Sequence, residues 1–203
     1  MAKNLPQDDT VTTVLPPQSR HYIVGIGSSA GGLEALSALI AALPNNLGLS
    51  YVVIQHLSPT HKSMLVQLLG RETSMSVCEI EDQMIPKVDV VHIAPASRNT
   101  IFKDGRFILM ETKRETLPKP SANVFLTSLA NEKGEDAIGI ILSGTGSDGT
   151  VGLREIKANG GFTFVQEPST AKYTGMPQSA IDSGCVDWVL SPEKIASEIT
   201  NIV

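Results

Sequence analysis

Short runs of β-branched and other apolar residues alternate along the chain with segments whose apolar residues recur at helical spacing. The runs typical of strands are Tyr22–Ile26, Ser50–Gln55, Val77–Ile80, Val88–Ile93, Ala137–Leu142, Gly161–Val165 and Val186–Leu190. Helical spacing occurs at Leu33, Leu36, Ile40 and Leu43; at Met64, Leu65, Leu68 and Leu69; at Val124, Phe125 and Leu129; and at Leu153 and Ile156. This alternation predicts a doubly wound, mostly parallel α/β sheet of the Rossmann-like class, with helices on both faces.

Three segments depart from this alternation. Thr100–Met110 carries the turn signal Asp104-Gly105 between apolar runs, which predicts a short antiparallel hairpin. The charged, proline-containing segment Glu111–Ser121 is expected to be a surface loop. Residues 1–20 are polar, and we expect a flexible lead-in or linker there, followed by one globular domain over residues 21–203.

Composition narrows the class of protein. The chain has 203 residues, 41% of them hydrophobic, which suits a single domain with a sizeable core. The net charge of -5 gives no electrostatic reason to expect nucleic acid or an anionic membrane as a partner. Without a signal-peptide pattern or an apolar run near the roughly 20 residues of a membrane span, we expect a cytoplasmic protein without membrane insertion. Cys78 and Cys185 are expected to be buried free thiols.

Side chains of three reactive types follow three of the predicted strands. The first strand leads into Gly27-Ser28-Ser29-Ala30-Gly31, and the second ends at His56. The run Ala137–Leu142 leads into a glycine-rich loop that contains Asp148. Because the carboxyl ends of parallel strands meet at one edge of a sheet, we expect the three side chains to lie close together. Serine, histidine and aspartate then form the set needed for nucleophile, general base and orienting acid.

Each of these residues also has an ordinary structural interpretation. Ser29 could cap a helix that starts at Ala30, His56 could be a partly buried structural histidine, and Asp148 could cap the helix that follows it. Ser28 competes with Ser29 for the nucleophile role, but only Ser29 has a glycine two residues away on either side. The joint occurrence at three strand ends favours the catalytic interpretation. The order Ser, His, Asp differs from the order Ser, acid, His of α/β-hydrolases.

A nucleotide site and a metal site are the alternatives. Gly144-x-Gly146-x-x-Gly149 resembles a dinucleotide fingerprint, and Gly25-x-Gly27-x-x-Ala30 fits its looser form. A carboxylate at Asp148, however, would repel the pyrophosphate that such a loop cradles. His56 and His61 do not have a ligand spacing for zinc. We therefore expect neither a cofactor nor a metal ion.

The same motifs resemble the catalytic domain of chemotaxis protein-glutamate methylesterases of the CheB type. The resemblance runs from about Ile23 to about Ile199. It is carried by Ile26-Gly27-Ser28-Ser29-Ala30-Gly31-Gly32, Gln55-His56, Leu142-Ser143-Gly144-Thr145-Gly146-Ser147-Asp148-Gly149 and Gly175-Met176-Pro177. It implies a methylesterase domain over residues 21–203, with Ser29, His56 and Asp148 as catalytic residues. It also implies that Ala30, Thr145, Gly146 and Met176 form or line the oxyanion site, with the loop ending at Met176-Pro177 close by.

The resemblance further implies a substrate and partners. They are methyl esters of glutamyl side chains on a methylated chemoreceptor or receptor-like signalling protein, with deamidation of glutamine as a related reaction. Three positions depart from the chemotaxis pattern, where threonine, methionine and asparagine are usual: Ala30, Thr145 and Ser147. The segment Leu57-Ser58-Pro59 departs as well. The pattern is closer to esterase-like domains fused to methyltransferase and sensor domains. A signalling module with weak or no turnover is the alternative of a different class.

Overall fold

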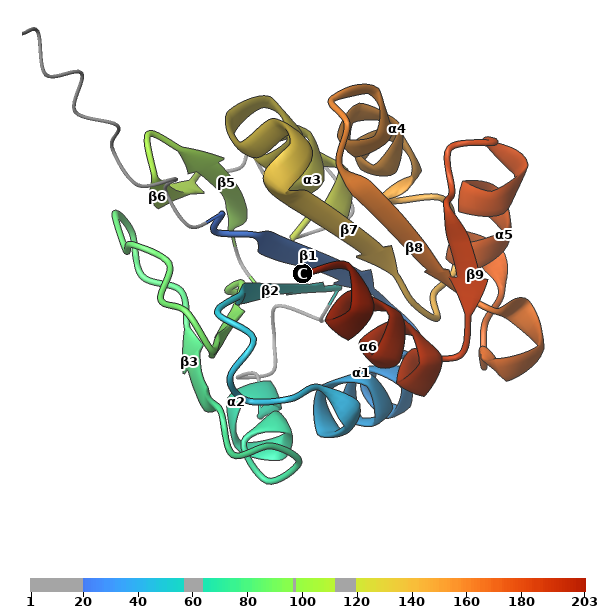
Figure 1. Ribbon diagram of the computed structural model, residues 1–203, viewed down its shortest axis with the longest axis horizontal. Helices are drawn as coiled ribbons and strands as arrows, with labels where there is room; N and C mark the ends of the chain where they lie inside the picture. Colours follow the sequence, from blue (N-terminus) through green and yellow to red (C-terminus); the bar gives the residue numbers. More distant parts are fainter. Residues whose placement is uncertain (1–19, 57–63, 97, 112–119) are drawn as a thin grey trace, which may run out of the picture.

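The computed structural model describes residues 20–56, 64–96, 98–111 and 120–203. Seven strands form one parallel sheet in the order β3-β4-β2-β1-β7-β8-β9, and β5 and β6 form a separate antiparallel hairpin (Figure 1). The strands are β1 (Ile23–Ser28), β2 (Ser50–Gln55), β3 (Ser76–Glu79), β4 (Val90–Ile93), β5 (Asn99–Lys103), β6 (Arg106–Met110), β7 (Ala137–Ile141), β8 (Phe162–Gln166) and β9 (Trp188–Leu190). The α/β fold class expected from the sequence, with its parallel sheet and short hairpin, is confirmed.

Helices cover both faces of the sheet. One face carries α1 (Gly32–Ala42), α2 (Leu65–Leu69) and α6 (Pro192–Ile202). The other carries α3 (Ala122–Lys133), α4 (Thr150–Ala158), α5 (Gly175–Asp182) and the hairpin. Short 3-10 turns precede β7 (Gly134–Asp136) and follow β8 (Pro168–Thr170). In Figure 1, α3 and α4 lie above the sheet and α1 and α6 below it.

The central strands are mostly apolar because they are buried on both faces, and their polar residues Ser28, Ser50 and Gln55 lie at strand ends. Every residue of β1, β2 and β7 is buried. Along β1, Val24 and Ile26 pack in the cluster under α1 and α6, whereas Ile23 packs in the cluster under α3 and α4. This two-sided burial is typical of parallel sheets and explains why these strands show no alternation of polar residues.

The order in which the chain adds strands to the sheet changes side at β1. From β1 it passes to β2, β3 and β4 on one side, and it then crosses over to β7, β8 and β9 on the other. In open parallel sheets, sites form beyond the carboxyl ends of the strands at such a switch point. The loops after β1, β2 and β7 meet there.

Several element boundaries differ from the sequence expectations. The helix after β1 begins at Gly32 rather than Ala30, because Gly31 adopts a positive φ of 68° at its N-cap. Leu33 and Met64 were expected on buried helix faces, but they are 37% and 63% exposed. The fourth strand starts only at Val90, since Asp89 has a φ of 55°.

Two helices were not expected from the sequence. Met176 and Pro177 do not end a loop; they lie in the first turn of α5. Helix α6 begins with a proline at its first position, where the missing amide costs no hydrogen bond. The turn of the hairpin agrees with expectation, because Asp104 and Gly105 both have positive φ angles.

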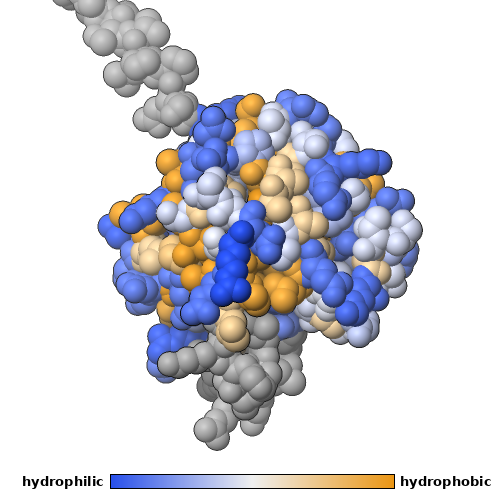
Figure 2. All heavy atoms as spheres, turned by 90° about the horizontal axis from the view of Figure 1, so that it is seen from below, coloured by the Kyte–Doolittle hydropathy of each residue, from blue (hydrophilic) through white to orange (hydrophobic). Residues whose placement is uncertain are grey.

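The face formed by α1, α2 and α6 is mixed in polarity. Figure 2 shows hydrophobic side chains gathered towards its middle, with hydrophilic side chains around and across them. None of the helices in the described ranges is both long and apolar enough to cross a bilayer.

Candidate active site

The backbone ladder of the sheet continues past the ends of the strands and joins the three loops that carry the predicted site. The Ser29 amide donates to the Ser143 carbonyl at 3.0 Å, and the His56 amide donates to the Ser28 carbonyl at 3.1 Å. Just beyond these bonds lies a cavity of about 390 Å³. Its lining is Ser29, His56, Asn123, Thr145, Gly146, Ser147 and Asp148. The structure thus brings the serine, histidine and aspartate of the sequence prediction to one cavity.

Ser29 lies in the tight turn between β1 and α1, where its side chain is partly exposed. The interpretation of Ser29 as a helix cap is wrong, because the N-cap of α1 is Gly31 and no side chain caps that helix. Ser28, by contrast, is fully buried on the α1 side, against Gly32. Of these two serines, only Ser29 lines the cavity.

His56 is paired with Asp148. Its Nε2 lies 2.7 Å from Oδ2 of Asp148, so the other ring nitrogen, Nδ1, is the one that could accept a proton from another group. Within the described part of the chain, no direct hydrogen bond joins the Ser29 hydroxyl to His56. Catalytic hydrogen bonds are commonly long without substrate and shorten in the reacting complex.

Asp148 is held by the N-terminus of α3. Its Oδ2 accepts from the Ala122 amide at 2.6 Å, and its Oδ1 accepts from the Asn123 amide and the Ser121 hydroxyl, each at 3.0 Å. The expectation that Asp148 caps the helix after it is therefore wrong, since it caps α3. Burial raises the pKa of Asp148, but hydrogen bonds from His56, Asn123 and Ala122 outweigh burial and hold that pKa below its usual value.

Helix α4, which follows Asp148, is capped in return from α3. The carboxamide oxygen of Asn123 accepts from the amides of Gly149 and Gly152 at 2.9 and 3.1 Å. Asp148 and Asn123 thus cap each other's helices. This reciprocal arrangement fixes the glycine-rich loop against α3, and it was not visible in the sequence because the two residues are 25 positions apart.

The predicted oxyanion and lining residues divide into two groups. The amides of Ala30, Thr145 and Gly146 have no acceptor among the described residues, and the latter two residues line the cavity. Met176 is fully buried and donates its amide to the Gly144 carbonyl at 2.9 Å. A β-carbon on Gly144 would collide with the Met176 thioether, so Met176 packs beneath the glycine loop.

Ser143 is a further structural residue of this edge that the sequence analysis missed. Its hydroxyl donates to the Ala30 carbonyl at 2.9 Å and accepts from the Tyr173 amide at 3.0 Å. The Gly144 amide in turn donates to the Tyr173 carbonyl. These bonds hold the nucleophile turn, the glycine loop and the segment before α5 in a fixed relation.

The geometry disfavours a dinucleotide at the glycine loop. Several helix amides that could receive a pyrophosphate are already bonded: those of Gly149 and Gly152 to Asn123, and those of Ala122 and Asn123 to Asp148. Within the described residues, no group of three or more histidine, cysteine, aspartate or glutamate side chains could hold a metal ion. Both described cysteines are free, Cys185 buried and Cys78 partly buried.

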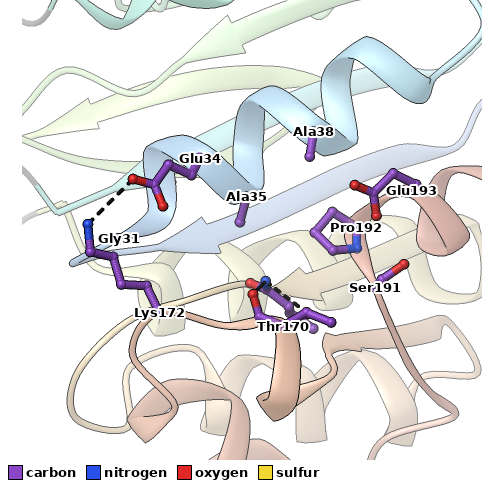
Figure 3. Close-up of a pocket in the computed structure, with 10 residues that line it drawn as sticks. Gly31, Glu34, Ala35, Ala38, Thr170, Lys172, Ser191, Pro192 and Glu193 are labelled. Atoms are coloured by element: carbon purple, nitrogen blue, oxygen red, sulfur yellow. Dashed lines mark hydrogen bonds and ion pairs between the residues drawn. The ribbon is translucent and has the colours of Figure 1, made fainter.

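A second cavity, of about 240 Å³, lies between the starts of α1 and α6 (Figure 3). Its lining combines small residues of α1 with an exposed ion pair, in which Lys172 lies 3.4 Å from Glu34. Ser29, His56 and Asp148 do not line it. It therefore offers no catalytic constellation.

Comparison with known proteins shows the family of the chain. The sequence model described as CheB methylesterase matches residues 24–199. The chain belongs to the CheB methylesterase family. The solved CheB methylesterase catalytic domain of Thermotoga maritima is similar with a TM-score of 0.86 and 33% identity, over 90% of this chain and 99% of that one. The resemblance inferred from the motifs is confirmed.

Two relatives align with most of this chain but over different shares of their own lengths. A relative from Leptospira interrogans is 36% identical over 172 residues, which are 84% of this chain and 89% of that protein. The protein-glutamate methylesterase/protein-glutamine glutaminase 1 of Geobacter sulfurreducens is 34% identical over 188 residues. That alignment covers 90% of this chain and 52% of the Geobacter protein. The chain thus spans about half the length of the second relative.

Proposed function

We propose that this CheB-family domain hydrolyses methyl esters of glutamyl side chains on chemoreceptor-type proteins in signal transduction. The observation that supports the proposal most strongly is the cavity shared by Ser29 and the His56–Asp148 pair. A hydroxyl, a base and a buried carboxylate at one cavity are what acyl transfer by a serine nucleophile requires.

The geometry supports the following reaction. Ser29 Oγ attacks the ester carbonyl while His56 Nδ1 takes its proton, and Asp148 fixes the ring through Nε2. Amides of the nucleophile turn and the glycine loop stabilise the oxyanion, with Ala30, Thr145 and Gly146 as donors. His56 then protonates methanol as it leaves. A water molecule, activated by His56, hydrolyses the acyl-enzyme to release the carboxylate.

Deamidation of glutamine is the same acyl chemistry with ammonia as the leaving group. The Geobacter relative carries both activities in its name. We propose the methyl ester as the main substrate, since methanol leaves more easily than ammonia. Methylated receptor-like proteins as partners, fusion to methyltransferase or sensor domains, a cytoplasmic location and the boundary near residue 20 also stay predictions.

Methanol release tests the proposal. The substrate is a helical receptor fragment that carries glutamyl methyl esters, incubated with the wild-type chain and with His56→Gln. We expect release by the wild type and a loss of about 10³-fold or more in His56→Gln. No release by a folded wild-type chain above the buffer rate would overturn the proposal and favour a signalling module without turnover.

A further inference from the structure

The catalytic acid is bonded to more groups than its role towards His56 requires. Each oxygen of Asp148 accepts two hydrogen bonds, and three of the four donors belong to the start of α3. Two of those three are backbone amides, which any sequence would supply. The third is the hydroxyl of Ser121, the only one of the three that a substitution can remove.

The direction of the Ser121 hydroxyl is set by its surroundings. Its oxygen accepts from the Val124 amide at 3.4 Å, which leaves the hydroxyl proton for Asp148. Its backbone amide donates to Asn99 Oδ1 of the hairpin at 2.9 Å, and the residue is only 8% exposed. The Ser121 hydroxyl therefore has one orientation in which it donates to Asp148. Hydrogen bonds to α3 and to β5 keep the residue in place.

We propose that Ser121 is a positioning residue for the hydrolysis, acting through Asp148 on His56. The inference rests on the proposed function, because it assigns Ser121 a place behind the same catalytic pair. A carboxylate bonded to Ser121 shares its negative charge between that hydroxyl and the histidine. The hydroxyl both fixes the plane of the carboxylate and limits how strongly it stabilises an imidazolium.

Removal of this hydroxyl should change the pH dependence of activity in one direction. With one donor fewer, Asp148 attracts the proton on His56 Nε2 more strongly and favours the charged ring. His56 must be neutral to accept a proton from Ser29, so activity is lost at a higher pH on the acid side. The looser carboxylate also positions the ring less well, which lowers turnover at every pH.

In the described part of the chain, the charged residues of the helices beside Asp148 are not bonded to it. Helix α4 carries Arg154, Glu155 and Lys157, and the far end of α3 carries Glu132 and Lys133. Within the described residues, none of these five side chains forms an ion pair or hydrogen bond with Asp148 or His56. The one ion pair that either residue forms there is the pair that they form with each other. Among the described residues, substitution at Ser121 therefore acts on a carboxylate whose one charged partner is His56.

The matched control is Ser128, on the same helix. Its hydroxyl donates to the Phe125 carbonyl and accepts from the Phe102 amide, so it joins α3 to β5 without any contact to Asp148. Ser128→Ala removes the same group and loosens the same helix. Ser121→Thr keeps the hydroxyl and serves as the rescue variant.

The experiment measures kcat/KM for ester hydrolysis between pH 5 and 9 in the wild type, Ser121→Ala, Ser121→Thr and Ser128→Ala. For Ser121→Ala we expect a loss of roughly 10-fold and an acid limb moved up by about half a pH unit. Ser121→Thr should return towards the wild-type profile, and Ser128→Ala should keep the wild-type limb. An acid limb in Ser121→Ala that coincides with that of Ser128→Ala overturns the proposal.

A second measurement separates this inference from the proposed function. In chains labelled with ¹⁵N-histidine, the Nε2 resonance of His56, assigned by its loss in His56→Gln, reports the bond to Asp148 without any substrate. We expect it to move in Ser121→Ala and to stay in place in Ser128→Ala. A moved resonance in a chain that releases no methanol would sustain the role of Ser121 while the esterase function fails. An unmoved resonance would overturn the role of Ser121 whatever the activity.

Discussion

Asp148 combines two tasks at the residue scale, because its carboxylate orients His56 and also caps α3. Asp148→Asn should therefore lower turnover by about 10³-fold or more, since the amide favours the wrong histidine tautomer. It should also lower the free energy of unfolding by about 1 kcal/mol, because a neutral oxygen is a weaker acceptor for the helix amides. Ester turnover and urea unfolding measure the two effects.

Asp187→Asn is the control for this prediction. Asp187 accepts from the Thr163 amide at 3.0 Å and pairs with Lys157, far from the cavity. This variant should lose stability while its turnover stays within about two-fold of the wild type. Wild-type turnover in Asp148→Asn would reduce Asp148 to a helix cap.

The sequence was sufficient to group Ser29, His56 and Asp148 at one cavity, but not to predict the groups that hold them. Ser29, His56 and Asp148 could be grouped because each follows a strand of one parallel sheet. The apolar runs of the sequence predict that sheet. Ser121 follows Pro120 at the start of a helical pattern, so its role as the N-cap of α3 could have been predicted from the sequence. Its bond to Asp148 was not, because that contact depends on how closely α3 approaches the end of β7.

At the scale of elements, His92 holds β4 to β2 and to the hairpin. Its Nδ1 lies 3.0 Å from the Tyr51 carbonyl, its Nε2 accepts from the Lys87 amide at 3.3 Å, and its ring packs 5.2 Å from that of Phe107. Because Nε2 is an acceptor, the ring must be neutral. Burial accordingly lowers the pKa of His92.

This environment predicts a loss of stability in mild acid. The unfolded chain binds a proton at His92 near pH 6.5, whereas the folded chain resists it, so stability falls as the pH drops below about 6.5. Burial also lowers the pKa of His21, which adds a contribution of the same sign. Between pH 7.5 and 5.5, the wild type should lose about 1 kcal/mol more than His92→Gln in urea unfolding. Equal losses in the two chains would contradict the assignment.

The glycine loop should bind no dinucleotide. Two amides at the N-terminus of α3 are bonded to Asp148 and two at that of α4 to Asn123, so a pyrophosphate that used these amides would have to displace both side chains. Calorimetry with NAD and FAD should show no saturable heat at micromolar concentrations. Saturable binding would revive the nucleotide alternative.

Elements were predictable where their residues are buried and apolar, and unpredictable where glycine and proline lie in a first helical turn. Strands β2 and β7 and the hairpin were found from their patterns. Helix α5 was mistaken for a loop because Gly175 and Pro177 open it, although both are tolerated there. Helix α1 was expected two residues too early, since nothing in the sequence fixes the positive φ of Gly31.

At the scale of the whole molecule, the order of strands places the site. The chain builds the sheet outwards from β1 in both directions, so three of the central loops converge at one edge. The sequence shows that strands and helices alternate, but it does not show that β7 returns to the side of β1. Only that crossover brings Asp148 to His56, 92 residues away along the chain.

The central claim is that Ser29 is the nucleophile, and covalent labelling tests it most directly. The wild-type chain, Ser28→Ala and Ser29→Ala are each treated with a small fluorophosphonate, and the intact mass and tryptic peptides are measured. Our account predicts one adduct, on Ser29, in the wild type and in Ser28→Ala, with none in Ser29→Ala. An adduct on Ser28, or undiminished labelling of Ser29→Ala, would contradict it.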